Sequence, residues 1–165
     1  MDNPIHNRPN TYMVIPRVLA FIEKKDEVLM IERSKESAFA YKKPNGVGGH
    51  TKKGEDPLTA VRREVKEETG LEIKEFELNA VLFIDVETEK GVCVFVFSAI
   101  YRGGALQSSN EGNLLWVKKK DITKSNIVKD VPLIMDLIEE SKKDGKIKYL
   151  QYIYTDQELI ITRID

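Results

Sequence analysis

Three glutamates, Glu64, Glu67 and Glu68, are the residues of this sequence whose types and spacing most clearly indicate chemistry. If their segment is helical, side chains three and four positions apart are neighbours, so the carboxylates crowd one flank of the helix. Each like-charged pair would then cost roughly 0.2–0.5 kcal/mol. Such a cluster indicates a hard divalent cation, because Mg²⁺ and Mn²⁺ are bound through oxygen ligands. The spacing therefore predicts a Mg²⁺ site, with Mn²⁺ as the alternative ion, in a protein that handles phosphates.

The glutamates belong to a longer pattern. Gly49 is followed after five residues by Glu55, and after seven more by the segment Arg63-Glu64-Val65-Lys66-Glu67-Glu68-Thr69-Gly70-Leu71. This arrangement is similar to the complete Nudix box, with every fixed position filled. The resemblance implies an enzyme that hydrolyses the diphosphate link between a nucleoside and another group, X. It also implies an α/β fold, the Nudix α/β/α sandwich with a mixed central β-sheet, to which the sequence adds an antiparallel hairpin.

The resemblance also assigns roles to residues. Glu64 and Glu68 are expected to hold the metal, the Gly48 carbonyl to be a further ligand, and Glu67 to be a ligand or the base. Arg63 is expected to orient the carboxylates or the loop through charge-assisted hydrogen bonds. Glu55 would anchor the loop, and a structural salt bridge is the alternative for both. Glu111, five residues before Trp116, is expected to be an extra ligand or the base, with a solvated loop glutamate as the alternative.

A second resemblance concerns the substrate. The segment from Phe39 to Gly49 and the acidic residue before Trp116 look like those of MutT-like enzymes that hydrolyse oxidised purine nucleoside triphosphates, such as 8-oxo-dGTP. It implies that Phe39, Asn45 and Asp130 bind the substrate, and Phe83 is a further candidate. Asn45 offers donors and an acceptor to a purine edge, and the two phenylalanines offer stacking surfaces. The alternatives are a core position for Phe83 and a helix N-cap for Asp130.

The chain also departs from those relatives, because it carries Lys42 and Lys43 near Asn45 and Val131 beside Asp130. The lysines suit phosphates better than a base. A purine nucleoside triphosphate, converted to the monophosphate and pyrophosphate, is therefore the first expectation. ADP-ribose, a dinucleoside polyphosphate or a nucleotide sugar is the alternative substrate. A nucleotide-binding regulator without turnover is the alternative class, although the intact glutamates argue against it.

The elements that must position these residues can be read from the surrounding pattern. Asp56 is a good N-cap for the glutamate helix, Pro57 suits its first position and Gly70 suits its C-terminal end. Apolar residues at three- and four-residue spacing give the helix a stripe that should face the core. Strands are expected at 13–22, 27–32, 78–86, 91–101 and 114–117, a second helix at 131–142, and a last hairpin from 149–154 and 158–162.

Composition narrows the functional classes. The 165 residues carry 26 Lys and Arg against 27 Asp and Glu, a formal net charge of −1, so neither nucleic acid nor an acidic membrane is an expected partner. The length favours one domain over 12–165 after a flexible tail over 1–11. Cys93 is the only cysteine and fits a buried core thiol. We expect a cytoplasmic protein, monomeric or homodimeric, that acts on a small nucleotide.

Overall fold

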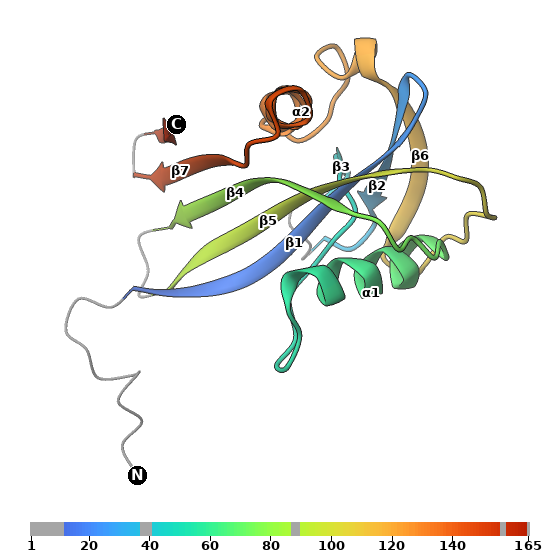
Figure 1. Ribbon diagram of the computed structural model, residues 1–165, viewed down its shortest axis with the longest axis horizontal. Coiled ribbons are helices and arrows are strands. Elements are labelled where there is room, and N and C mark those ends of the chain that lie inside the picture. Colours follow the sequence, from blue (N-terminus) through green and yellow to red (C-terminus); the bar gives the residue numbers. More distant parts are fainter. Residues whose placement is uncertain (1–11, 37–40, 87–89, 156–157, 165) are drawn as a thin grey trace.

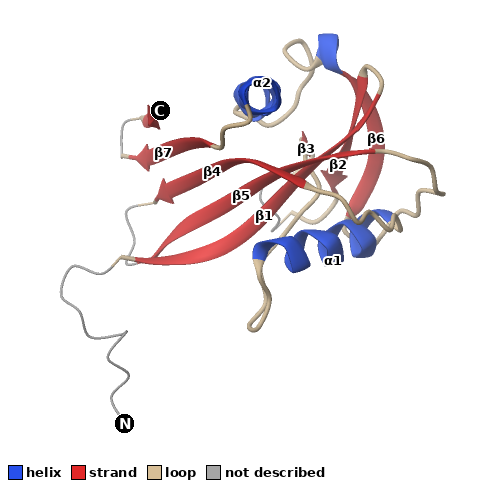
Figure 2. Ribbon diagram, in the orientation of Figure 1, coloured by secondary structure: helices blue, strands red, loops and turns tan. Residues whose placement is uncertain are grey.

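The computed structural model describes residues 12–36, 41–86, 90–155 and 158–164. One eight-stranded mixed sheet forms its centre, with helix α1 on one face and helix α2 on the other (Figures 1 and 2). This α/β/α arrangement confirms the predicted fold class. The predicted tail, residues 1–11, lies outside the described residues. In the part of the chain that the structure describes, no helix is long and apolar enough to cross a membrane.

The sheet has the strand order β3-β2-β1-β5-β4-β7-β8, and β6 pairs with β2 off this path. Parallel pairing joins β1 to β5 and β4 to β7, whereas the other neighbouring strands are antiparallel. The strands are β1 (Met13–Lys24), β2 (Glu27–Arg33), β3 (Pro44–Asn45), β4 (Glu77–Asp85), β5 (Lys90–Ile100), β6 (Gly112–Lys118), β7 (Lys148–Tyr154) and β8 (Leu159–Ile164).

Helix α1 (Pro57–Thr69) carries the glutamates and has the predicted ends. The Asp56 side chain accepts hydrogen bonds from the amides of Leu58 and Thr59 at the N-terminus. At the other end Gly70 adopts the left-handed conformation, with φ of 75°, which glycine tolerates without steric cost. The apolar stripe of α1 is buried against the sheet. The carboxylate flank therefore lies at the edge of this core layer.

Helix α2 (Val131–Asp144) covers the opposite face of the sheet and packs on alternate residues of β1, β4 and β7. A short 3₁₀ helix, Lys119–Asp121, precedes it. The predicted last hairpin is present as β7 and β8. All six residues of β8 are exposed, and this strand forms one edge of the sheet.

Candidate active site

A cavity of about 1260 Å³ opens on the face of the sheet that carries α2 and reaches the segment Gly46–His50 and helix α1. It has an acidic end, formed by residues of α1, and an apolar floor of sheet residues. Most of the predicted site residues line it: Asn45, Gly48, Arg63, Glu64, Glu67, Glu68, Glu111 and Asp130. Residues that are 82 positions apart in the chain, from Gly48 to Asp130, thus share one cavity.

The glycine-rich segment is held against β1 by backbone hydrogen bonds. Val18 donates to the Gly49 carbonyl at 2.9 Å, and Ala20 donates to the Val47 carbonyl at 2.7 Å. A Cβ at Gly48 would lie 2.1 Å from the Val18 carbonyl oxygen, so only glycine fits there. This close approach leaves the Gly48 amide pointing at Glu68, whose Oε2 accepts its hydrogen bond at 2.9 Å.

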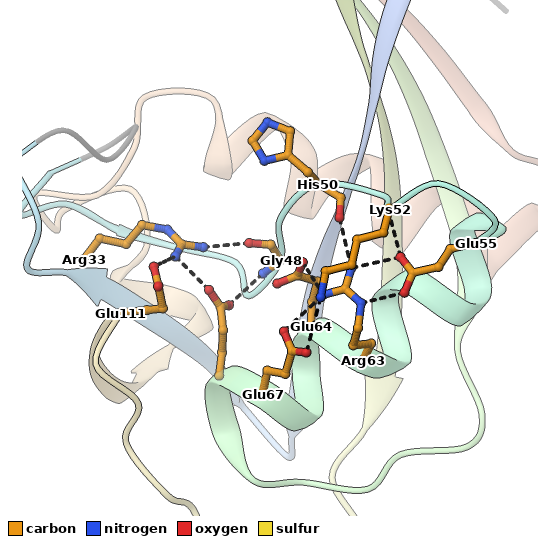
Figure 3. A network of polar contacts seen from close by, with 10 residues as sticks. Arg33, Gly48, His50, Lys52, Glu55, Arg63, Glu64, Glu67 and Glu111 are labelled. Atoms are coloured by element: carbon orange, nitrogen blue, oxygen red, sulfur yellow. Dashed lines mark hydrogen bonds and ion pairs between the residues drawn. The ribbon is translucent and has the colours of Figure 1, made fainter.

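Glu68 is the most buried of the three glutamates, at 3% exposed. Burial raises the pKa of its carboxyl, and the Arg33 guanidinium opposes that effect. Arg33, at the end of β2, donates to Glu68 Oε1 and to the Gly48 carbonyl, both at 2.7 Å. Figure 3 shows its contact with Gly48. Arg33 also lies 3.5 Å from Glu111 Oε2. One guanidinium therefore contacts three of the predicted metal ligands.

Arg63 forms a second cluster with the other acidic residues of the box (Figure 3). It contacts Glu55 at 2.6 and 2.9 Å, Glu64 at 2.7 Å and Glu67 at 3.1 Å. It also donates to the His50 carbonyl at 3.0 Å, which ties the loop to the helix. The hydrogen bonds from Arg63 lower the pKa of Glu55 to about 2. The expected contacts of Arg63 with the carboxylates, the loop and Glu55 are all present.

The three glutamates are thus spaced by arginines rather than crowded against each other. Among the described residues, no three His, Cys, Asp or Glu side chains stand close enough together to hold an ion. The repulsion expected from the sequence is relieved in this structure by Arg33 and Arg63. The donor set nonetheless fits a hard cation, because carboxylate and carbonyl oxygens already surround the positive charge of Arg33.

The far part of the cavity is suited to a flat ring. Its floor is apolar and comes from Leu82, Ile84, Val92 and Val94. Asp130 lies beside this floor; it occupies the N-cap position of α2, as the alternative expected, but its side chain makes no capping hydrogen bond. Burial raises the pKa of its carboxyl. The neighbouring Tyr152 hydroxyl is buried, and burial, the Asp130 charge and a hydrogen bond with Asp130 raise its pKa.

One of the predicted substrate residues, Phe83, is not brought to this cavity. Phe83 is 44% exposed and lies on the opposite face of β4 from Leu82, because successive side chains of a strand alternate. Its position favours neither the pocket nor the core. Phe39 lies outside the described residues. Asn45 lines the cavity, where its side-chain oxygen accepts a hydrogen bond from the Gly46 amide at 2.8 Å.

The cavity also contains Arg17, Arg33 and Tyr152, which the sequence did not indicate as site residues. Arg33 is the last residue of a strand and Arg17 lies within another. In the sequence, an arginine at such a position looks the same as a solvated surface residue. The sequence predicted the strand β7, but not that its Tyr152 faces a cavity. His50 lines the cavity beside Arg17, and burial and the charge of Arg17 lower the pKa of its imidazole.

Comparison with known proteins identifies relatives of this arrangement. The family model described as NUDIX domain matches residues 13–136. A mutator MutT protein from Bacillus halodurans has a similar structure, with a TM-score of 0.73 and 23% identity over 90% of this chain and 97% of that chain. A MutT protein from Methanosarcina mazei Go1 gives a TM-score of 0.66 and 27% identity over 81% and 96% of the two chains.

A third similar structure is the NUDIX domain of Shewanella oneidensis NrtR complexed with ADP ribose. Its TM-score is 0.62, with 15% identity over 87% of this chain and 94% of that chain. At identities below 25%, the Bacillus and Shewanella structures show the shared fold alone. The three together place the sheet and the two helices of this protein in one fold family.

Proposed function

The chain belongs to the NUDIX domain family and is a Nudix hydrolase, and from this premise we propose that it cleaves a purine nucleoside triphosphate to the monophosphate and pyrophosphate with the help of Mg²⁺. One observation carries the proposal. The Asp130 carboxyl is free of the helix it precedes, and it shares one cavity with the glutamates of α1. A ligand in this cavity can therefore present a polar ring edge to Asp130 and a phosphate chain to the acidic end.

The metal would be held by the Gly48 carbonyl, Glu64, Glu68 and Glu111. When bound, a divalent ion neutralises phosphate charge, orients the reacting groups and lowers the pKa of a bound water. Arg33 contacts Gly48, Glu68 and Glu111 and would hold these ligand oxygens close to one another. Arg63 keeps Glu64 and the loop in place through its hydrogen bonds. It acts as a positioning residue.

Glu67 is the proposed general base. Its side chain is 53% exposed, so the carboxylate can reach water at the rim of the cavity. Glu111 is a weaker candidate, because its hydrogen bond to Lys35, at 2.8 Å, lowers the pKa of its carboxyl. A carboxylate with a lowered pKa accepts a proton less readily. We therefore assign Glu111 to the metal and Glu67 to the water.

The nucleobase would lie over the apolar floor, with Asn45, Asp130 and Tyr152 at its edge. Asn45 can donate through its amide nitrogen, because its oxygen is already used by Gly46. The Tyr152 hydroxyl can donate or accept at the ring edge, and the Asp130 carboxyl can accept from a ring N–H or amino group or, when protonated, donate. An amide nitrogen, a hydroxyl and a carboxyl at one edge suit guanine or oxidised guanine, whose edge carries both a carbonyl oxygen and N–H donors, better than adenine.

A panel assay tests the proposal. Purified protein with Mg²⁺ is given GTP, dGTP, 8-oxo-dGTP, ATP, ADP-ribose, a dinucleoside polyphosphate and a nucleotide sugar, and pyrophosphate is measured separately from phosphate. The proposal expects pyrophosphate and a monophosphate from a purine triphosphate, with a guanine base preferred. Faster turnover of ADP-ribose or of another diphosphate would identify that compound as the substrate instead. Nucleotide binding without turnover on any substrate would identify a regulator instead.

A further inference from the structure

Arg17 is a half-buried cation in the cavity, and no side chain contacts its guanidinium directly among the described residues. Unlike Arg33 and Arg63, it makes no hydrogen bond or ion pair in the part of the chain that the structure describes. Burial lowers the pKa of its guanidinium, and the charge of Arg33 adds to this effect. A charge removed from water without a partner costs free energy. A partner that arrives from solution would recover this cost.

The position of Arg17 lies between the two ends of the cavity. In the sheet register, Arg17 of β1 pairs with Val94 of β5, and Val94 pairs with Leu82 of β4. One row of paired residues therefore runs from Arg17 into the apolar floor. On its other side Arg17 forms an isolated β-bridge with His50, at the end of the glycine-rich segment. Glu64 and Glu68 are near enough for their charges to favour the charged guanidinium. Arg17 thus stands at the junction of the floor and the acidic end.

We propose that Arg17 binds the non-bridging oxygens of the phosphate next to the nucleoside, and that it keeps this contact in the nucleoside monophosphate product. The inference rests on the proposed function, which places a nucleobase over the floor and the scissile diphosphate at the glutamates. The phosphate that joins them then lies at the junction. A guanidinium can donate two parallel hydrogen bonds to a phosphate, whereas a lysine offers a point charge.

The alternative is that Arg17 only balances the charges of Glu64 and Glu68. These two roles differ in what they require of the ligand. A phosphate-binding arginine discriminates between a nucleotide and the nucleoside that lacks its phosphate. A charge-balancing arginine affects the stability of the protein or all ligands alike, because it touches none of them.

Binding without metal or turnover separates the two roles. The affinities of GMP and guanosine are measured by titration calorimetry or ligand-observed NMR in EDTA, for wild type, Arg17→Met and Arg17→Lys. AMP and adenosine form a second pair. Arg102→Met is the matched control, because Arg102 is an exposed arginine, paired with Glu75, that does not line this cavity. Circular dichroism and thermal unfolding verify that each variant is folded, and Arg17→Gln replaces Arg17→Met if that variant is not.

We expect GMP to bind Arg17→Met roughly 10- to 100-fold more weakly than wild type, the loss typical of a hydrogen bond to a charged group. Guanosine affinity should stay within about twofold, Arg17→Lys should be intermediate, and Arg102→Met should behave as wild type. Unchanged GMP affinity, an equal loss for GMP and guanosine, or no binding of either monophosphate to wild type would overturn the inference. If wild type hydrolyses a nucleotide of the panel but Arg17→Met binds GMP as tightly as wild type does, only the proposed role of Arg17 is refuted. If Arg17→Met loses GMP affinity as predicted but wild type hydrolyses no nucleotide of the panel, only the proposed hydrolysis is refuted.

Discussion

Replacing Gly49 by alanine should disable the site and leave the fold intact. A Cβ at this position would lie 2.7 Å from Cδ and Oε1 of Glu64 and 2.8 Å from its Oε2. Ordinary van der Waals contact begins at 3.4 Å, so the carboxylate must move by about 0.7 Å. The moving group is the end of a flexible side chain, and the free energy of unfolding should therefore change by at most about 1 kcal/mol.

The same shift acts strongly on the chemistry, because Mg²⁺ demands near-ideal octahedral geometry. Misplacing a positioned group by about 1 Å can cost a factor of roughly 100 in rate. We expect kcat/KM for pyrophosphate release to fall by roughly 10- to 100-fold, equivalent to about 1.4–2.7 kcal/mol of activation free energy. Steady-state kinetics with Mg²⁺ and chemical denaturation of the same preparations supply both quantities.

Two other glycines make matched controls. A Cβ at Gly145 meets nothing within 4 Å, but its φ is 70°, so Gly145→Ala should cost about 1 kcal/mol of stability and leave kcat/KM unchanged. A Cβ at Gly48 meets the Val18 backbone at 2.1 Å, so Gly48→Ala should disturb the fold itself. Activity of Gly49→Ala within twofold of wild type would refute the reasoning. A loss of stability like that of Gly48→Ala would do the same.

Three further predictions concern charged groups of the cavity. Glu64→Gln and Glu68→Gln should each lower kcat by orders of magnitude with an unchanged circular dichroism spectrum, because each removes charge from the proposed metal ligands; near-full activity in both would remove them from that role. Glu67→Gln should abolish the rise of kcat with pH while Glu111→Gln keeps it, and the reverse result in a pH–rate profile would make Glu111 the base. Burial raises the pKa of Asp130 above its ordinary 3.8, so the folded state binds this proton more tightly than the unfolded state. The free energy of unfolding therefore falls as pH rises from the pKa of the unfolded state to that of the folded state. Asp130→Asn should therefore gain stability relative to wild type on going from pH 4 to pH 7, and denaturant unfolding that shows an equal difference at both values would contradict the burial of this carboxyl.

Local signals determined the parts of the structure that sequence could predict. Asp56 and Gly70 bound α1 because a side-chain cap and a left-handed glycine act within one helical turn. The strands and α2 follow from apolar periodicity, so the confirmed fold class needed little long-range information. The box itself brought Arg63 and Glu55 together, eight positions apart, as expected.

Contacts between distant segments could not be predicted in this way. Arg33 and Glu68 lie 35 positions apart and meet only because β2 ends beside the glycine-rich segment. Arg17 lies in the cavity because β1 pairs in parallel with β5, and no local sequence pattern predicts that pairing. Phe83 was misplaced for a related reason, since the register of β4 decides which of its faces receives each side chain.

The central claim is that the glutamates of α1 serve the cleavage of a purine nucleoside triphosphate in this cavity. Its most direct test is pyrophosphate release from GTP, dGTP and 8-oxo-dGTP with Mg²⁺, measured in parallel for wild type and Glu68→Gln. We predict pyrophosphate and monophosphate in equal amounts from the wild type, no release in EDTA, and a loss of orders of magnitude in the variant. Folded wild-type protein that releases no pyrophosphate from any of the three, or a variant as active as wild type, would contradict it.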